Sequence, residues 1–180
     1  MKLYHAPGSC SQAICIVLQE TGLNADVVTV DARRHLLPDG TSYYDVSELG
    51  YVPLLELQDG TFLREGTVIA QYLADQSPES KLAPAHGSIE RYRLLERLNF
   101  LSTEIHKGFI PLLYAVAAGK WVDTARPKLE SRWAAGGLSD ANRRMPRVAL
   151  LNWPGPKPIV FSRTFVARTP AAGPKQDRLA

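Results

Sequence analysis

The chain has 180 residues, of which 45% are hydrophobic, 21 are Lys or Arg, 18 are Asp or Glu, and two are cysteines. This composition is typical of a folded globular protein and excludes collagen-like, coiled-coil and wholly disordered chains. The apolar runs are too short to span a membrane, and Pro7 interrupts the N-terminus where a signal peptide needs its apolar core. Because the cysteines are too few for a disulfide scaffold or a four-cysteine zinc site, we expect a cytoplasmic protein without a bound metal.

Charge and proline content separate the last 47 residues from the rest. Residues 1–133 hold 13 basic and 16 acidic side chains, whereas residues 134–180 hold 8 and 2, together with six prolines. Prolines at this density interrupt every candidate helix, so we expect residues 134–180 to be irregular and mobile. This basic tail has no aromatic residues interleaved in a way that suits base stacking, which argues against nucleic-acid binding.

The first 77 residues alternate strand and helix signals, with turns that mark the boundaries. A strand that leads through a helix to a second strand predicts a parallel pair, and a later hairpin adds antiparallel strands. The sequence therefore predicts a mixed sheet with helices on its faces. The predicted elements are a strand at 2–5, a helix from a Ser9 or Ser11 cap to Gly22, a strand at 25–30, an irregular segment at 31–50, a hairpin of 54–57 with 61–64, and a helix ended by Pro78.

A helical region follows a short linker. Residues 78–87 have linker composition, and Ser88 can cap a long helix with apolar residues spaced by three or four, including Leu98 and Ile105. We expect Pro111 to bend this helix and a further helix to begin within residues 121–133. An α/β domain over residues 1–77 thus precedes an all-helical domain that starts at residue 88.

Cys10 is the leading candidate for chemistry because it follows the Pro7-Gly8 turn and lies where a strand leads into a helix. The amides and the positive dipole at a helix N-terminus favour a thiolate over a thiol. A thiolate there can attack a disulfide or an electrophile, or accept a hydrogen bond from another thiol. The alternative is a small apolar filler residue. Dithiol chemistry would need a second cysteine at position 13, which is Ala13, and we expect Cys15 to be part of the core.

Two further features lie near strand ends. A cis peptide before Pro53 would expose the backbone groups of Val52 for pairing with an extended peptide, although an ordinary edge-strand proline is equally compatible. Glu65 and Gly66 stand where the hairpin meets a helix, so the helix amides can bind a carboxylate and Glu65 an α-ammonium group. A plain solvated helix cap is the alternative.

Asn99, Thr103 and His106 are spaced by four and three, which places them on one face of the long helix. Most such polar faces are merely solvated. The alternative is a ligand-facing stripe in which His106 donates a hydrogen bond or acts as a base. The sequence contains no nucleotide-binding or nucleophile-elbow motif.

Together these motifs resemble the glutathione S-transferases, specifically the bacterial beta class, over residues 1–133. The resemblance implies a thioredoxin-like N-terminal domain, an all-helical C-terminal domain, a homodimer, and glutathione as cosubstrate without a further cofactor. The matching motifs are Met-Lys-Leu-Tyr at 1–4, Pro-Gly-Ser-Cys at 7–10, Gly-Tyr-Val-Pro at 50–53, Asp-Gly-Thr at 59–61, Leu-Arg-Glu-Gly at 63–66, Gln-Tyr-Leu-Ala-Asp at 71–75 and Glu-Ile-His-Lys-Gly-Phe at 104–109.

The same resemblance implies roles for particular residues. Cys10 and His106 would be catalytic, with Cys10 at the glutathione sulfur and able to form a mixed disulfide with it. Val52, held by a cis Pro53, would pair with the cysteinyl backbone of glutathione. The resemblance assigns the remaining glutathione contacts to His35, Glu65, Gly66, Asn99, Thr103, Glu104 and Ile105.

The sequence departs from the family pattern at three places. Gly66 replaces a common serine, and His35 stands where relatives often have a lysine facing the glycyl carboxylate, so a neutral imidazole would weaken that contact. Tyr4 lies near the catalytic tyrosine of other classes and is a secondary candidate. The family's later amphipathic helices have no counterpart after Trp133, which we interpret as a reading-frame change, with true divergence as the alternative.

Three functions remain open from the sequence. Transfer of glutathione to small electrophiles is the main expectation. Glutathione-dependent thiol-disulfide exchange needs only Cys10, because a second glutathione can resolve the mixed disulfide. A non-catalytic binding module is the third. If later helices do not cover the apolar face of the helix from Ser88, we expect a marginally stable chain.

Overall fold

The structure, a computed structural model, describes residues 1–135. The described chain forms two compact units, one spanning residues 1–83 and the other beginning at Pro84. The sequence predicts an irregular tail from residue 134 and a reading-frame change near Trp133. Residues 136–180 of this tail lie outside the described part. Within the described residues, no helix is long and apolar enough to cross a membrane.

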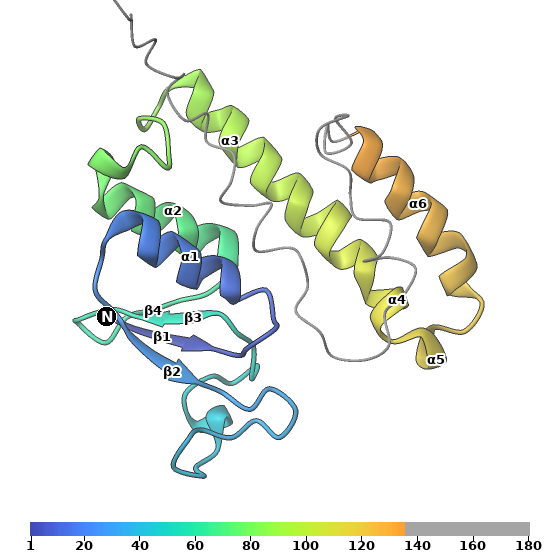
Figure 1. Cartoon of the computed structure of the whole chain (residues 1–180), viewed down its shortest axis with the longest axis horizontal. Helices are drawn as coiled ribbons and strands as arrows, with labels where there is room; N and C mark the ends of the chain where they lie inside the picture. The colour runs from blue at the N-terminus through green and yellow to red at the C-terminus, as the bar shows by residue number, and fades with distance from the viewer. Residues whose placement is uncertain (136–180) are drawn as a thin grey trace, which may run out of the picture. The chain divides into compact units, whose positions relative to one another are not determined.

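The first unit is a four-stranded mixed sheet with the strand order β2-β1-β3-β4. Strand β1 (Lys2–His5) pairs in parallel with β2 (Asp26–Thr29), and the hairpin of β3 (Leu54–Glu56) and β4 (Phe62–Leu63) is antiparallel. Helices α1 (Gln12–Thr21) and α2 (Gly66–Gln76) lie side by side on one face of this sheet (Figure 1). This βαβ-ββα arrangement is thioredoxin-like, and it confirms the predicted strands and helices.

Alternating residues on the strands build two cores. Leu3 on β1 and Leu55 on β3 face the helices and pack with Ile14 and Ile69. Tyr4 and its partner Leu54 point to the opposite face, as the period-two geometry of strands requires. Val30 and Tyr43 from the segment after β2, which includes the short 3-10 helix η1 (Tyr43–Asp45), pack with them on that face.

Helix α1 ends as predicted but begins differently. Gly22 adopts φ 68° at the C-cap, a left-handed conformation that glycine reaches at low cost. Ser11 occupies the N-cap position, yet its hydroxyl makes no capping hydrogen bond to the helix. It bonds instead to the backbone of Ala6 and to His5, so the predicted position is right and the predicted contact is wrong.

The second unit begins with the predicted cap. The Ser88 hydroxyl accepts a hydrogen bond from the Arg91 amide at 3.1 Å, and α3 (Ile89–Phe100) follows. The chain continues through a π-helical segment, η3 (Leu101–His106), a 3-10 turn, η4 (Lys107–Phe109), and α4 (Ile110–Leu113). The departure from α-helical geometry thus begins ten residues before Pro111, which lies in the first turn of α4.

Two more helices follow in the described part of this unit. After the short α5 (Ala115–Ala118), α6 (Trp121–Ala135) contacts η3, η4 and α4, and it confirms the helix expected from Trp121. Leu129 of α6 is almost fully buried and approaches Gly108 so closely that a Cβ there would lie 2.9 Å from Leu129 Cδ1. Leu98 and Ile105 are buried, whereas Ile89 and Tyr92 are 61% and 60% exposed. Within residues 1–135, burial on the apolar face of α3 and its continuation in η3 is therefore greatest toward the C-terminal end.

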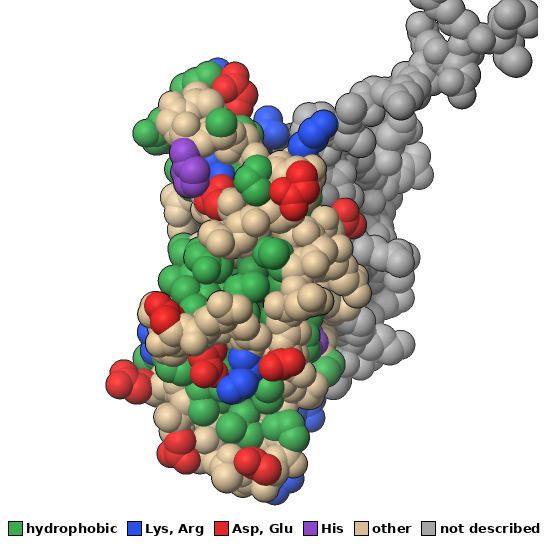
Figure 2. Space-filling view, turned by 90° about the vertical axis from the view of Figure 1, so that its left-hand side faces the viewer, with side chains coloured by type: hydrophobic (Ala, Val, Ile, Leu, Met, Phe, Trp, Pro, Cys, Tyr) green, Lys and Arg blue, Asp and Glu red, His purple; other side chains and the backbone are tan. Residues whose placement is uncertain are grey.

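The surface mixes charges with exposed apolar groups. Figure 2 shows one face on which hydrophobic side chains lie among acidic and basic ones. In the first unit, Leu49, Tyr51 and Val68 are among the exposed large hydrophobic residues.

Candidate active site

Cys10 lies in the turn between β1 and α1, one residue before the N-cap of the helix. Its Sγ donates a hydrogen bond to the carbonyl oxygen of Val52 at 3.5 Å, a contact between residues 42 positions apart. Its own carbonyl accepts from the amide of Ala13 in the first turn of the helix. The thiol is therefore partly accessible, at the positive end of α1, and beside the half-buried bend that precedes β3.

The Val52–Pro53 peptide bond is cis, which is the form that the family resemblance implies. Pro53 is buried, and it also lies next to the start of α2, since a Cβ on Gly66 would be 3.6 Å from Pro53 Cγ. The fold thus gathers Cys10, Val52, Pro53 and Gly66 from three separate stretches of the chain.

Glu65 and Gly66 mark the start of α2. Glu65 is the N-cap residue, adopts φ 63°, and has an exposed side chain that makes no capping hydrogen bond. Its carbonyl accepts from the amides of Val68 and Ile69. The Glu65 carboxylate is thus available to a positive group, and the amides at the start of α2, where Gly66 has no side chain, are available to a negative one. Together they can bind a zwitterionic ligand group.

His35 is fixed in an unusual conformation. It adopts φ 53°, and its ring stacks on Tyr44 with centroids 4.6 Å apart. Its Nδ1 is buried without a hydrogen-bond partner and lies against Gly50, where a Cβ would be 2.6 Å away. Gly50, at φ 64°, is two residues before Val52, so the ring of His35 packs against the loop that carries the cis peptide.

A second hydrogen-bond network supports the turn that holds Cys10. His5 Nδ1 is 2.8 Å from Ser11 Oγ, and Ser9 Oγ is 2.5 Å from the same oxygen. Ser11 Oγ also accepts from the Ala6 amide at 3.1 Å. Ser11 is completely buried, and burial lowers the pKa of His5. Sequence reasoning did not assign this network, although the serines flanking Cys10 and the histidine at the end of β1 were visible.

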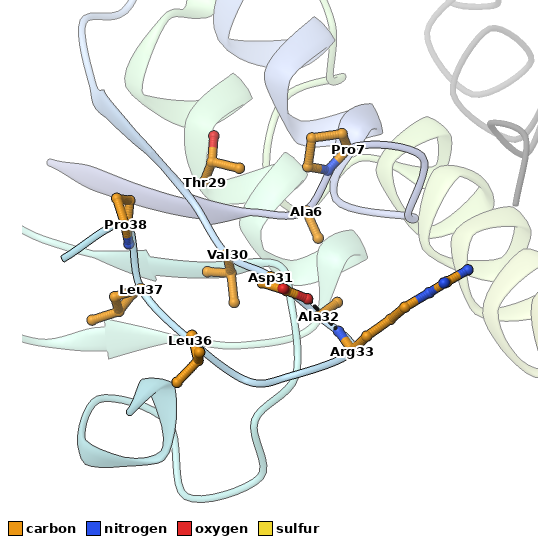
Figure 3. A pocket seen from close by; sticks show the side chains of 10 residues that line it. All are labelled: Ala6, Pro7, Thr29, Val30, Asp31, Ala32, Arg33, Leu36, Leu37 and Pro38. Carbon is orange, nitrogen blue, oxygen red and sulfur yellow. Dashed lines mark hydrogen bonds between the residues drawn. The ribbon is translucent and has the colours of Figure 1, made fainter. Parts of the chain in front are cut away.

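An open pocket of about 560 Å³ lies beside this turn (Figure 3). Ala6 and Pro7 from the turn form one wall, and Val30 and Leu36 are among the apolar residues of the segment after β2. Its lining also includes Thr29, Asp31, Ala32, Arg33, Leu37 and Pro38. Asp31 accepts hydrogen bonds from the amides of Arg33 and Arg34, which lower its pKa, and the Arg33 side chain extends away from the other residues (Figure 3).

Tyr4, the secondary candidate, has a structural contact instead. Its hydroxyl donates to Glu56 Oε2 at 2.9 Å, and Lys2 Nζ lies 3.1 Å from the same oxygen. Burial, followed by the bond to Glu56, raises the pKa of Tyr4. A buried phenol held in this way is poorly suited to activate a thiol.

The candidates of the second unit lie on α3 and η3. Asn99 and Thr103 are exposed, and the Thr103 hydroxyl donates to the Asn99 carbonyl at 3.0 Å. Thr103 and His106 both belong to the π-helical segment, so the α-helical spacing on which their common face was predicted does not hold there. π-helical segments are frequent at functional sites.

Two neighbours in the same segment contribute to the packing of the second unit. The Glu104 carboxylate forms an ion pair with Arg132 of α6, and the Ile105 side chain is fully buried. Both side chains therefore have structural contacts within this unit.

No group of three or more His, Cys, Asp or Glu side chains that could hold a metal ion occurs in residues 1–135. Cys15, half-buried, packs against the core of the first unit, and burial raises the pKa of its thiol, which agrees with the expected core role.

Comparisons with known proteins identify relatives of this chain. Residues 3–81 match the family model "Glutathione S-transferase, N-terminal domain". Glutathione S-transferase GstA of Escherichia coli O157:H7 is 43% identical over 132 residues, which are 73% of this chain and 66% of that protein. The chain thus covers slightly less than two thirds of this relative.

Three solved structures are similar to the described fold. The ternary complex of BphK, a bacterial GST, has 46% identity and a TM-score of 0.72, covering 75% of this chain and 68% of that one. A sphingomonad glutathione S-transferase complexed with glutathione has 42% identity and a TM-score of 0.67, with 75% and 67% covered. The bacterial beta class enzyme of Sphingomonas chungbukensis has 39% identity and a TM-score of 0.70, with 78% and 71% covered.

A thioredoxin-like unit with a thiol at the first helix, followed by a helical unit, defines the class of protein. The chain belongs to the glutathione S-transferase family and is similar to its bacterial beta class.

Proposed function

We propose that this chain binds glutathione and conjugates it to small electrophiles, with Cys10 at the glutathione sulfur. The observation that carries this proposal is the contact of Cys10 Sγ with the Val52 carbonyl, next to a cis peptide. An extended peptide paired with Val52 would carry its own cysteinyl sulfur past Cys10. That a sphingomonad relative has been solved with glutathione supports the choice of peptide.

The rest of the first unit offers partners for both ends of glutathione. The Glu65 carboxylate would meet the α-ammonium group, and the amide of Gly66 would donate to the α-carboxylate at the start of α2. His35 would face the glycyl carboxylate. Its Nδ1 is buried against Gly50, so an Nε2–H donor is the one that this ring can offer a ligand.

The reaction that follows is a nucleophilic displacement. Glutathione loses its thiol proton to solvent, the thiolate sulfur forms a bond to the electrophilic carbon, and the leaving group departs with the electron pair of the broken bond. The helix dipole and the thiol of Cys10 stabilise the thiolate before attack, and binding removes the entropy of bringing two reactants together. The apolar walls of the pocket beside Ala6 and Pro7 favour an apolar electrophile.

From the family resemblance, we further propose that Asn99, Thr103, Glu104, Ile105 and His106 contribute to glutathione binding, with His106 as a hydrogen-bond donor or base. We also propose that the chain acts as a homodimer in the cytoplasm. Cys10 and Cys15 are not joined in a disulfide, which is compatible with a reducing compartment.

Calorimetry with glutathione and a conjugation assay with a chlorinated dinitrobenzene test the proposal together. Wild-type protein and Cys15→Ala should bind glutathione and form the conjugate. Cys10→Ala should lose most of the conjugation rate. Absence of glutathione binding in wild type would favour a non-catalytic module and contradict the proposal.

Thiol-disulfide exchange is a second candidate, because Cys10 is partly accessible and contacts the Val52 carbonyl, whereas Cys15 packs against the core. The Cys10 thiolate would attack a glutathionylated thiol, release that thiol, and keep the glutathionyl group as a mixed disulfide. A second glutathione would then release glutathione disulfide and restore Cys10. Rates on a glutathionylated peptide and on the chlorinated aromatic, measured with one preparation, separate the two activities.

A further inference from the structure

The network behind Cys10 contains a titratable group that the proposed reaction does not use. His5 is the last residue of β1, and its Nδ1 is 2.8 Å from the hydroxyl oxygen of Ser11, which is completely buried. Ser9 and Ser11 flank Cys10 on both sides, so this network spans the turn that carries the thiol.

The contacts of Ser11 Oγ determine which hydrogen-bond pattern is possible. A hydroxyl has one proton to donate and two lone pairs to accept. The Ala6 amide donates to Ser11 Oγ at 3.1 Å, and Ser9 Oγ, which itself accepts from the Ser11 amide at 3.2 Å, lies 2.5 Å away. If Ser9 donates as well, both lone pairs of Ser11 are used, and its proton has two acceptors within reach: the Ala6 carbonyl at 3.3 Å and His5 Nδ1 at the shorter distance of 2.8 Å. The side chains of His5, Ser9 and Ser11 are then all hydrogen-bonded to one another, provided that Nδ1 carries a lone pair.

Protonation of His5 breaks this pattern. An Nδ1–H would become a third donor toward Ser11 Oγ, which has two lone pairs, so Ser9 would lose its acceptor. The Ser11 proton would turn to the Ala6 carbonyl, which is 3.3 Å away. Burial lowers the pKa of His5, in agreement with a neutral ring at pH 7.

The following polar and titratable groups also lie near His5. Thr29 is its register partner on β2 and does not titrate. Asp31, beyond the end of β2, holds its carboxylate on the amides of Arg33 and Arg34. Tyr4, the preceding residue, donates to Glu56, and Cys10 is the titratable group of the turn itself.

We propose that His5 is a positioning residue for the thiol site: its neutral Nδ1 accepts the Ser11 hydroxyl proton and so orders the Ser9–Cys10–Ser11 turn. Protonation of His5 releases the Ser9 hydroxyl and weakens glutathione binding. This proposal rests on the proposed glutathione function, which it deepens.

Two measurements test it on the full chain. Proton–nitrogen correlation spectra of the histidine rings report the tautomer without any ligand. They should show His5 as the Nε2–H form at pH 7, with Ser11→Ala changing the Nδ1 shift. An Nδ1–H tautomer at pH 7 would overturn the proposal even if glutathione binds.

Binding of S-methylglutathione, which lacks a thiol, is then measured by calorimetry from pH 7.5 to pH 5. Wild type should lose affinity by about two- to tenfold as His5 is protonated, the range expected for one hydrogen bond. His5→Asn, which keeps an uncharged acceptor near the Nδ1 position, should keep wild-type affinity at pH 7.5 and lack this step. His5→Phe should bind more weakly at both ends, and the exposed-site control His86→Asn should keep the step.

The outcomes separate this proposal from the function on which it rests. A pH step that persists unchanged in His5→Asn contradicts the role of His5, whereas binding by neither wild type nor any variant contradicts the glutathione function. In that second case the tautomer spectra still decide whether His5 orders the turn.

Discussion

Replacing Gly66 by serine should strengthen glutathione binding, because it adds a hydroxyl at the start of α2 in space that the fold leaves open. A Cβ at this position would lie 3.6 Å from Pro53 Cγ and 4.0 Å from Ile14 Cδ1, which are ordinary van der Waals distances. The backbone of Gly66 is not in the left-handed region, so a side chain adds no backbone strain.

The size of the effect follows from one added hydrogen bond to the α-carboxylate of glutathione. Hydrogen bonds to charged groups contribute about 1.5–3 kcal/mol, and exposure of the neighbouring Glu65 reduces this to about 1 kcal/mol. A gain of about 1 kcal/mol lowers the Kd about fivefold.

Isothermal titration calorimetry with glutathione measures this effect, and Gly66→Ala is the matched control. Alanine adds the Cβ without the hydroxyl, so its Kd should stay close to that of the wild type. Equal affinities for Gly66→Ser and Gly66→Ala, or weaker binding by the serine variant alone, would refute the reasoning that α2 holds the γ-glutamyl end.

Three further predictions concern stability. Gly50→Ala should destabilise by about 2–4 kcal/mol in urea unfolding, since the new Cβ would lie 2.6 Å from the His35 ring and at φ 64°. Tyr4→Phe should cost about 1 kcal/mol at pH 7. Hydrogen bonds from Tyr4 and Lys2 lower the pKa of Glu56 in the folded state. The difference in stability between wild type and Tyr4→Phe is therefore full at pH values above the ordinary carboxyl pKa, and it should shrink as the pH falls toward 3. Gly108→Ala should lower the free energy of unfolding by about 1–3 kcal/mol, because the new Cβ overlaps Leu129 Cδ1. The double variant Gly108→Ala/Leu129→Ala should lose less than the sum of the losses of the two single variants.

Each stability prediction has a control or a contradicting result. Gly22, like Gly50, has a left-handed φ, here 68°, but a Cβ at Gly22 would have nothing within 4 Å. Gly22→Ala should therefore lower the free energy of unfolding less than Gly50→Ala. A Tyr4→Phe difference that is constant from pH 7 to pH 3 would exclude Glu56 as the partner. Strict additivity at Gly108 and Leu129 would show that the two side chains do not meet.

Local signals predicted the sheet and helices well, because the deciding features lie close together in the sequence. The Pro7-Gly8 turn, the Gly22 stop and the Ser88 cap each act within a few residues, and the structure has an element boundary at each of them. The contact of Cys10 with Val52 joins residues 42 positions apart and was not predicted, although the family motifs assigned both residues to glutathione binding.

Other features depend on tertiary packing that no local pattern reports. The π-helical geometry of Leu101–His106 breaks the 3.6-residue period used for Thr103 and His106. Ser11 has the residue type of a cap, yet its burial against β1 directs the hydroxyl to His5 and Ala6 instead. The close approach of Gly50 to His35 likewise depends on a loop closing onto itself.

Identification of the thiol that forms a mixed disulfide tests the central proposal most directly. The full chain is incubated with glutathione disulfide, digested without reduction, and the modified peptide is identified by mass spectrometry. The proposal predicts one glutathionyl group on Cys10, retained in Cys15→Ala and absent in Cys10→Ala. Modification of Cys15 alone, or none on Cys10 in a chain that binds glutathione, would contradict the placement of Cys10 at the glutathione sulfur.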